Sequence, residues 1–143
     1  MHDRTVEVLD TWAIAFSKDS ANPLWKRICP GQYKHVALLR FSAKADTWLY
    51  IDMNFSGVNV IVGPGDTEAI EVISGAMGEV DILTFPVERT APMIFRCLFT
   101  CVQFVKHALG VRAFWVMFPD QLYDYLLARG AEVWTVRRSP PVP

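Results

Sequence analysis

The sequence has almost no net charge, because 14 Lys and Arg residues nearly balance 15 Asp and Glu residues. A chain without a basic surplus lacks the broad positive field that attracts phosphate backbones or acidic membrane surfaces. We therefore expect no nucleic-acid partner. The chain also lacks an uninterrupted apolar run of the ~20 residues that a membrane span needs. The N-terminus shows no secretory signal pattern either, so we expect a soluble, cytoplasmic protein.

Cysteine is scarce and unpaired in spacing. The three cysteines, Cys29, Cys97 and Cys101, form an odd set without a CxxC pair, whereas disulfide frameworks and structural zinc sites usually show paired spacing. A metal held by Cys97, Cys101 and His107 would need a fourth ligand from elsewhere in the chain. We therefore expect reduced thiols, no metal and no other cofactor.

Apolar and aromatic residues are abundant. They make up 52% and 13% of the 143 residues, respectively, which is enough for one domain with a substantial core. We expect a single domain over residues 1–136, followed by a mobile proline-rich tail over 137–143.

The strongest strand signals are two runs rich in apolar and β-branched residues, at 34–41 and 47–54, with a polar stretch between them. This pattern predicts a β-hairpin. The segment 11–16 reads as a strand or as one helical turn. Further strands are predicted at 58–62, 79–87 and 132–136.

Turn and capping residues predict three helices. One extends from Asp66 through residue 76, a second runs from residue 101 to about residue 109 before Gly110, and a third begins at Pro119 and stops before Gly130. Together with the strands, they predict an α+β fold in which a small antiparallel sheet packs against two to three helices.

Local signals place Cys101 at the start of its helix. Thr100 and Gln103 have the spacing of a capping box, and Phe99 and Phe104 have that of a hydrophobic staple. A thiol in the first helical turn lies beside unpaired amides and the positive end of the helix dipole, which favour the thiolate. The same amides can supply part of an oxyanion hole. The alternative is a small, buried and inert side chain, which we expect for Cys29 and Cys97.

A cysteine nucleophile usually needs an imidazole base, and the chain has only three histidines. His2 lies in the terminus, and His107 lies six residues after Cys101, about 240° around the helix. His35, at the start of a strand, is the candidate by elimination, although a hydrogen-bonded histidine at the sheet edge is also consistent with the sequence.

The hairpin suggests the third member of a catalytic group. If its loop centres near residues 43–44, His35 lies opposite or diagonal to Asp52, because side chains on one strand face recur every second residue. A carboxylate there can orient the ring and stabilise its charged form. The register leaves Asn54 and Tyr50 as alternatives, and Asp52 can equally be a solvated surface residue.

The order of His35, a polar residue on the next strand and Cys101 at a helix start resembles the circularly permuted papain-like cysteine hydrolases. That group includes the permuted NlpC-type peptidases and the lecithin:retinol acyltransferase-like enzymes. The matching stretches are YKHVAL (33–38), WLYID (48–52) and TCVQFVKHALGVR (100–112), and FPDQLY (118–123) resembles a helix of small phage-encoded relatives. Many relatives carry histidine at the third position, where this chain offers Asp52 or Asn54.

The resemblance covers roughly residues 33–128 and implies a permuted papain-like fold and a cysteine peptidase or amidase without a metal. The substrate would be a peptide, amide or ester, and a cell-wall peptide is one candidate. An acyltransferase would share the same covalent intermediate. The competing hypothesis is a catalytically inactive structural or interaction protein that assembles with phage proteins, in a viral particle or the host cytoplasm. Its support is the aromatic cluster at 114–118, for which an ordinary buried strand is the simpler interpretation.

Overall fold

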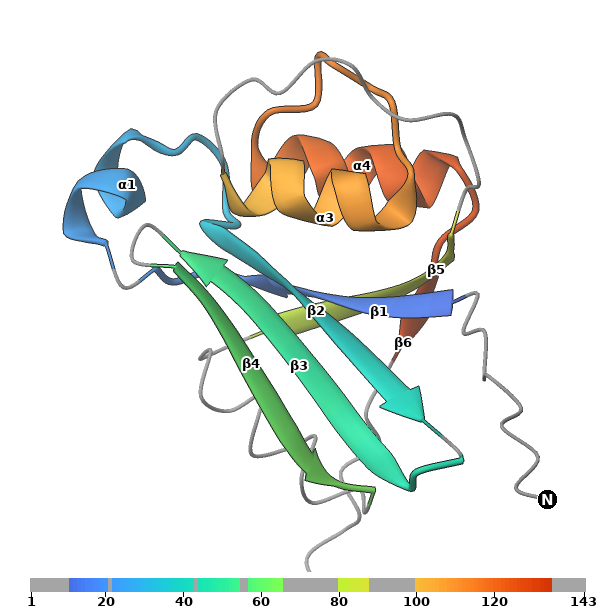
Figure 1. Ribbon diagram of the computed structural model, residues 1–143. Coiled ribbons are helices and arrows are strands. Elements are labelled where there is room, and N and C mark those ends of the chain that lie inside the picture. Colours follow the sequence, from blue (N-terminus) through green and yellow to red (C-terminus); the bar gives the residue numbers. More distant parts are fainter. Residues whose placement is uncertain are drawn as a thin grey trace, which may run out of the picture.

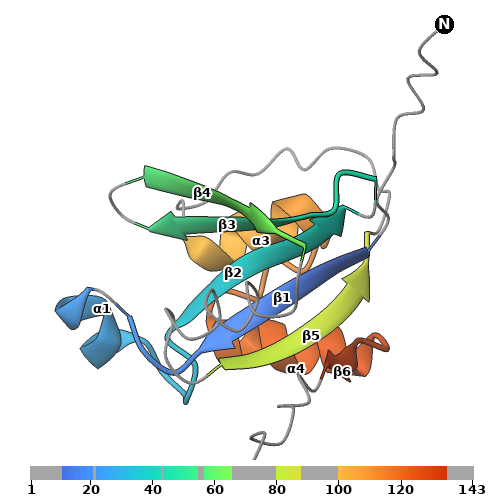
Figure 2. The same ribbon diagram turned by 90° about the horizontal axis from the view of Figure 1, so that it is seen from below.

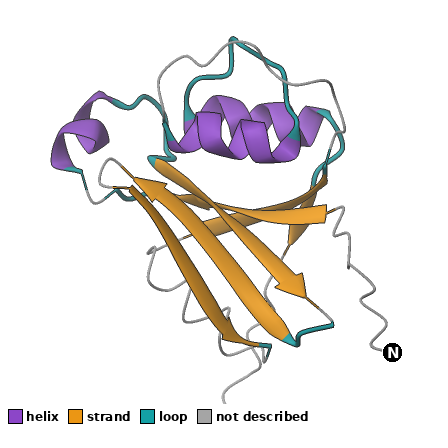
Figure 3. Ribbon diagram, in the orientation of Figure 1, coloured by secondary structure: helices purple, strands orange, loops and turns teal. Residues whose placement is uncertain are grey.

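The computed structural model describes residues 11–20, 22–42, 44–54, 57–65, 80–87 and 100–134. Within them, six strands form one antiparallel sheet in the order β4-β3-β2-β1-β5-β6 (Figures 1 and 3). The strands are β1 (Thr11–Ser17), β2 (His35–Ser42), β3 (Thr47–Asn54), β4 (Gly57–Pro64), β5 (Val80–Pro86) and β6 (Glu132–Trp134).

Two helices cover one face of this sheet. They are α3 (Cys101–Leu109) and α4 (Pro119–Ala128), which lie side by side above the strands (Figures 1 and 2). A short helix, α1 (Pro23–Ile28), lies at one end of the sheet. The predicted α+β class, with a small antiparallel sheet against two to three helices, is therefore confirmed.

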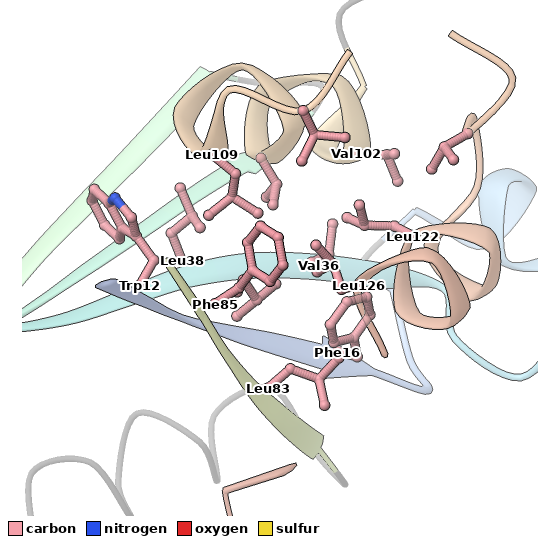
Figure 4. Close-up of a cluster of buried hydrophobic side chains, with 14 of the residues drawn as sticks. Trp12, Phe16, Val36, Leu38, Leu83, Phe85, Val102, Leu109, Leu122 and Leu126 are labelled. Carbon is pink, nitrogen blue, oxygen red and sulfur yellow. The ribbon is translucent and has the colours of Figure 1, made fainter. Parts of the chain in front are cut away.

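The core lies between the sheet and these two helices (Figure 4). Alternate strand residues point into it, as the two-residue period of a strand requires. From the strands come Trp12, Phe16, Val36, Leu38, Leu83 and Phe85, and from the helices Val102, Val105, Leu109, Leu122 and Leu126. Burial of each large side chain contributes about 1.5–3 kcal/mol relative to its exposure to water, so this layer fixes α3 against the strands.

The predicted hairpin is formed by β2 and β3. The register pairs Leu38 with Ile51 and Ser42 with Thr47, and the turn includes Asp46 in a left-handed conformation, with a φ of 47°. The segment 11–16 is a strand and not a helical turn, because β1 pairs with β2 on one side and β5 on the other.

The helix ends follow the local signals for the most part. The described helices begin at Cys101 and Pro119, and Gly110 caps α3 with a φ of 74°, which glycine adopts without strain. The expected strands at 58–62 and 79–87 correspond to β4 and β5. The expected strand at 132–136 corresponds to β6 over its described residues, Glu132–Trp134. The predictions for residues 66–76, Phe99 and the tail over 137–143 lie outside the described residues.

One helix was not predicted. The sequence patterns indicate no element between residues 17 and 33, yet α1 begins immediately after Asn22, whose side chain accepts a hydrogen bond from the Trp25 amide at 3.1 Å. Pro23 occupies the first helical position, where its missing N–H would have no helical partner. Asn22 and Pro23 were thus the unrecognised start signal.

The prediction of a buried strand at 114–118 is wrong. The segment between α3 and α4 contains turns and irregular backbone, and it returns across the helix layer to the start of α4 (Figure 1). Phe114 is 81% exposed and Trp115 is 59% exposed, whereas Val116 is buried. The aromatic pair has no strand partner to pack against because the segment lies on the far side of the helices from the sheet.

A buried lysine fixes this connecting segment. The Nζ atom of Lys106, on α3, donates a hydrogen bond to the Val116 carbonyl oxygen at 2.8 Å. Burial lowers the pKa of Lys106, because an ammonium group loses hydration inside the protein. The side chain therefore ties the middle of the 111–118 segment to α3.

Candidate active site

Cys101 lies at the first residue of α3, as its sequence context predicted. The Thr100 hydroxyl oxygen accepts a hydrogen bond from the Gln103 amide at 3.3 Å, and Thr100 has extended backbone angles. This is the geometry of an N-cap. Cys101 packs within the core cluster but retains 8% of its exposure.

His35 lies diagonally across the hairpin from Asp52. The register of β2 and β3, extended by three residues, places Asn54 opposite His35 and Asp52 two residue pairs further along, on the same face. The His35 Nε2 atom contacts the Asp52 Oδ1 atom. Both side chains are mostly buried, at 16% and 19% exposure. The predicted diagonal position of Asp52 therefore matches the geometry of the hairpin.

The imidazole has a second neighbour in the Cys101 side chain. Burial by itself lowers the pKa of His35, but hydrogen bonds to Asp52 and Cys101, together with the charges of both groups, outweigh burial and raise it to about 10. An imidazole with that pKa carries both ring protons at neutral pH. His35 therefore lies between a carboxylate from β3 and a thiol from α3.

Tyr50 adds a hydroxyl group to the same face. It lies two residues before Asp52 on β3, and its side chain is buried. Burial raises the pKa of Tyr50, and the negative charge of Asp52 and a hydrogen bond to it raise the pKa further. Of the three polar residues left open by the sequence, Asp52 contacts the imidazole, Tyr50 lies beside the carboxylate, and the side chain of Asn54 lies outside the described part.

The segment before β2 is held by a residue that the sequence did not single out. The Asp120 carboxylate, in the first turn of α4, accepts hydrogen bonds from the backbone amides of Gln32 and Tyr33 at 2.9 Å and 2.6 Å. Gly31 has a φ of +84°, and a Cβ atom there would lie 2.1 Å from an Asp120 oxygen. These contacts fix the chain immediately before His35. A first-turn aspartate was the only available signal.

Of the remaining cysteines and histidines, Cys29 and His107 lie in the described part of the chain. Cys29 is buried, and burial raises the pKa of its thiol. His107 is exposed in the last turn of α3. Cys97 and His2 fall outside the described part of the chain.

When an imidazole lies between a thiol and a carboxylate, it can accept the proton of the thiol, and the carboxylate then stabilises the positive charge on the ring. In the described ranges, no three His, Cys, Asp or Glu side chains are grouped to bind a metal ion. None of the described helices is both long and apolar enough to span a membrane.

Comparison of the chain with protein-family models, with curated proteins and with solved structures found no match.

Proposed function

We propose that the protein is a cysteine hydrolase that cleaves an amide or ester bond. The observation that carries this proposal is the position of His35, whose imidazole contacts the Asp52 carboxylate and has the Cys101 side chain as a second neighbour. A helix-terminal thiol beside a charged, oriented imidazole is the arrangement that nucleophilic cysteine chemistry requires.

Each group has a distinct role in the proposed reaction. The proton of the Cys101 thiol passes to His35, and the sulfur attacks the substrate carbonyl carbon, forming a C–S bond and a tetrahedral oxyanion. His35 donates a proton to the leaving amine or alcohol as the C–N or C–O bond breaks, which leaves a thioester. Water then attacks the thioester while His35 accepts its proton. The C–S bond breaks, the acid is released, and His35 returns the proton to the sulfur.

The surrounding groups support both steps. Asp52 contacts the Nε2 atom of the ring, so Nδ1 is the nitrogen that exchanges a proton with the Cys101 sulfur. The carboxylate thereby orients the ring and stabilises its positive charge. Backbone N–H groups in the first turn of α3 have no partner within the helix, and they are the donors that we propose for the oxyanion.

We further propose the permuted papain-like arrangement as the detailed fold. Its support is the chain order of His35, Asp52 and Cys101, together with the resemblance of residues 33–128 to that group. The α+β architecture is compatible with it. A cell-wall peptide as substrate rests on the same resemblance.

Alkylation by iodoacetamide, followed at each cysteine by mass spectrometry over a pH series, tests the thiol–imidazole pair. We expect Cys101 to react selectively well below pH 8 and to lose that reactivity in His35→Ala. His107→Ala is the matched control, because this exposed histidine lies on the same helix as Cys101, and it should react like the wild type. Ordinary thiol reactivity, or equal effects of both variants, would contradict the proposal.

A substrate assay tests the chemistry itself. Cys101→Ser should abolish turnover of a peptide or ester substrate, because a hydroxyl beside His35 is a far weaker nucleophile than a thiolate. Full turnover by this variant would exclude the mechanism. Addition of amine or alcohol acceptors separates a hydrolase from an acyltransferase, since only the latter forms a new acyl product with them.

A second candidate function is a catalytically inactive interaction protein that assembles with phage proteins. The exposure of Phe114 and Trp115 favours it, because large exposed aromatic side chains often mark protein contacts. The alkylation experiment distinguishes the two: an unreactive Cys101, unaffected by His35→Ala, supports the interaction protein.

A further inference from the structure

The outer edge of β4 offers unpaired backbone groups. Among the strands that the structure describes, β4 is the last on its side of the sheet and pairs only with β3 (Figure 2). The pairing is continuous over eight residues, from Gly57 opposite Asn54 to Pro64 opposite Thr47, without a bulge. An edge strand of this kind presents a row of free N–H and C=O groups along its other side.

The side chains of β4 do not protect this edge. The strand has the sequence GVNVIVGP and contains no charged residue. Val58, Val60, Ile61 and Val62 are 50–65% exposed. Natural edge strands are usually protected by lysines, by inward-pointing charges, by bulges or by short length, and in β4 only Pro64, at its end, interrupts the row of donors. The opposite edge strand, β6, has three residues and includes Glu132.

The layer of helices does not extend to this strand. α3 packs mainly on β2 and β3. The start of β3 and the end of β4 project away from the helices (Figure 1). The apolar side chains of β4 therefore line a sheet margin that the described helices leave open.

We propose that β4 is a self-association edge, which pairs antiparallel with β4 of a second copy of this chain. The row of N–H and C=O groups along the outer edge of β4 can be paired only by an extended strand, so the partner is a strand. The absence of charge selects a second copy, since two β4 strands meet without like-charge repulsion. A two-fold axis at Val60 brings valines of the two copies onto the same face of a continuous sheet, as an isologous dimer requires. This inference is independent of the proposed hydrolase activity.

Sedimentation velocity over a wide range of protein concentration tests the proposal. We expect the wild type to form a dimer as concentration rises. Val60→Lys should weaken dimerisation by roughly tenfold or more, equivalent to about 1.4 kcal/mol or more, because two lysines would face each other across the axis. Leu24→Lys is the matched control: Leu24 is an exposed apolar residue on α1, away from β4, and this variant should dimerise like the wild type.

Hydrogen exchange identifies which surface is covered. In the dimer, amides of β4 should exchange more slowly than in the Val60→Lys monomer, while circular dichroism of the two proteins remains the same. A wild type that stays monomeric at every concentration would overturn the proposal. So would a dimer that Val60→Lys leaves intact, or protected β4 amides in a monomer, which would show that another segment of the same chain covers the edge.

Discussion

The Asp120 carboxylate accepts a 2.6 Å hydrogen bond from the backbone amide of Tyr33, two residues before His35. It accepts another from the Gln32 amide. The N-terminal turn of α4 thereby fixes the chain from which the imidazole projects, although the two segments lie 87 residues apart in sequence.

Asp120→Ala should therefore affect both stability and the site. Loss of hydrogen bonds to a charged acceptor costs about 1.5–3 kcal/mol each, which urea denaturation measures. Cys101 alkylation should slow as well, because the chain before His35 is no longer anchored and the imidazole is held less firmly beside the thiol. Asp124→Ala, at an exposed aspartate on the same helix, is the control. If Asp120→Ala lowers stability but leaves Cys101 reactivity intact, the anchoring role is wrong.

The raised pKa of His35 makes folding sensitive to alkaline pH. The folded-state pKa is about 10, against an ordinary value of 6.5, so the folded protein holds this proton more tightly than the unfolded chain. The resulting stabilisation is complete below pH 6.5 and is lost as pH rises towards about 10. Urea denaturation of the wild type and His35→Gln across this window should show a steeper decline for the wild type. Parallel curves would contradict the expectation.

Asp52 should be required for the reactivity of Cys101. Asp52→Ala removes the carboxylate that orients and charges the imidazole, and general-base catalysis of this kind typically contributes 10²- to 10⁴-fold. We expect a loss of about that size in the rate of substrate turnover. Asp52→Asn retains a hydrogen-bond acceptor and should lose less. Equal rates for Asp52→Ala and the wild type would show that the contact with His35 has no functional role.

The N-cap of α3 gives a prediction on stability alone. Thr100→Ala removes the hydroxyl that accepts from the Gln103 amide, at a cost of about 1 kcal/mol. Thr100→Ser keeps that oxygen and should remain close to the wild type in thermal denaturation. A loss in Thr100→Ser as large as in Thr100→Ala would mean that packing of the methyl group, and not capping, sets the effect.

Local signals predicted much of the fold and part of the candidate site. The hairpin of β2 and β3 follows from strand alternation, and the start of α3 follows from the spacing of Thr100 and Gln103. Both depend on residues close in sequence. The choice among Tyr50, Asp52 and Asn54 could not be made, because alternation places all three on one strand face.

The errors and omissions depend on contacts between distant segments. Asp120 reaches Tyr33 only after α4 docks, and no local pattern predicts that contact. The aromatic residues at 114–118 have the composition of a buried strand, but their position beyond the helix layer exposes Phe114 and Trp115. Hydrophobic composition indicates which residues favour burial, whereas the path of the chain decides which of them achieve it.

The contact between His35 and Asp52 closes within a single hairpin, at a sequence separation of only 17. The thiol arrives from α3, which contacts that hairpin after most of the sequence has been synthesised. Hairpins close within microseconds, while pairing of distant segments is slower. The imidazole and carboxylate are therefore expected to meet early in folding, and the sulfur to join them only when α3 docks on the sheet. A nascent or partly folded chain would then hold the base without its nucleophile.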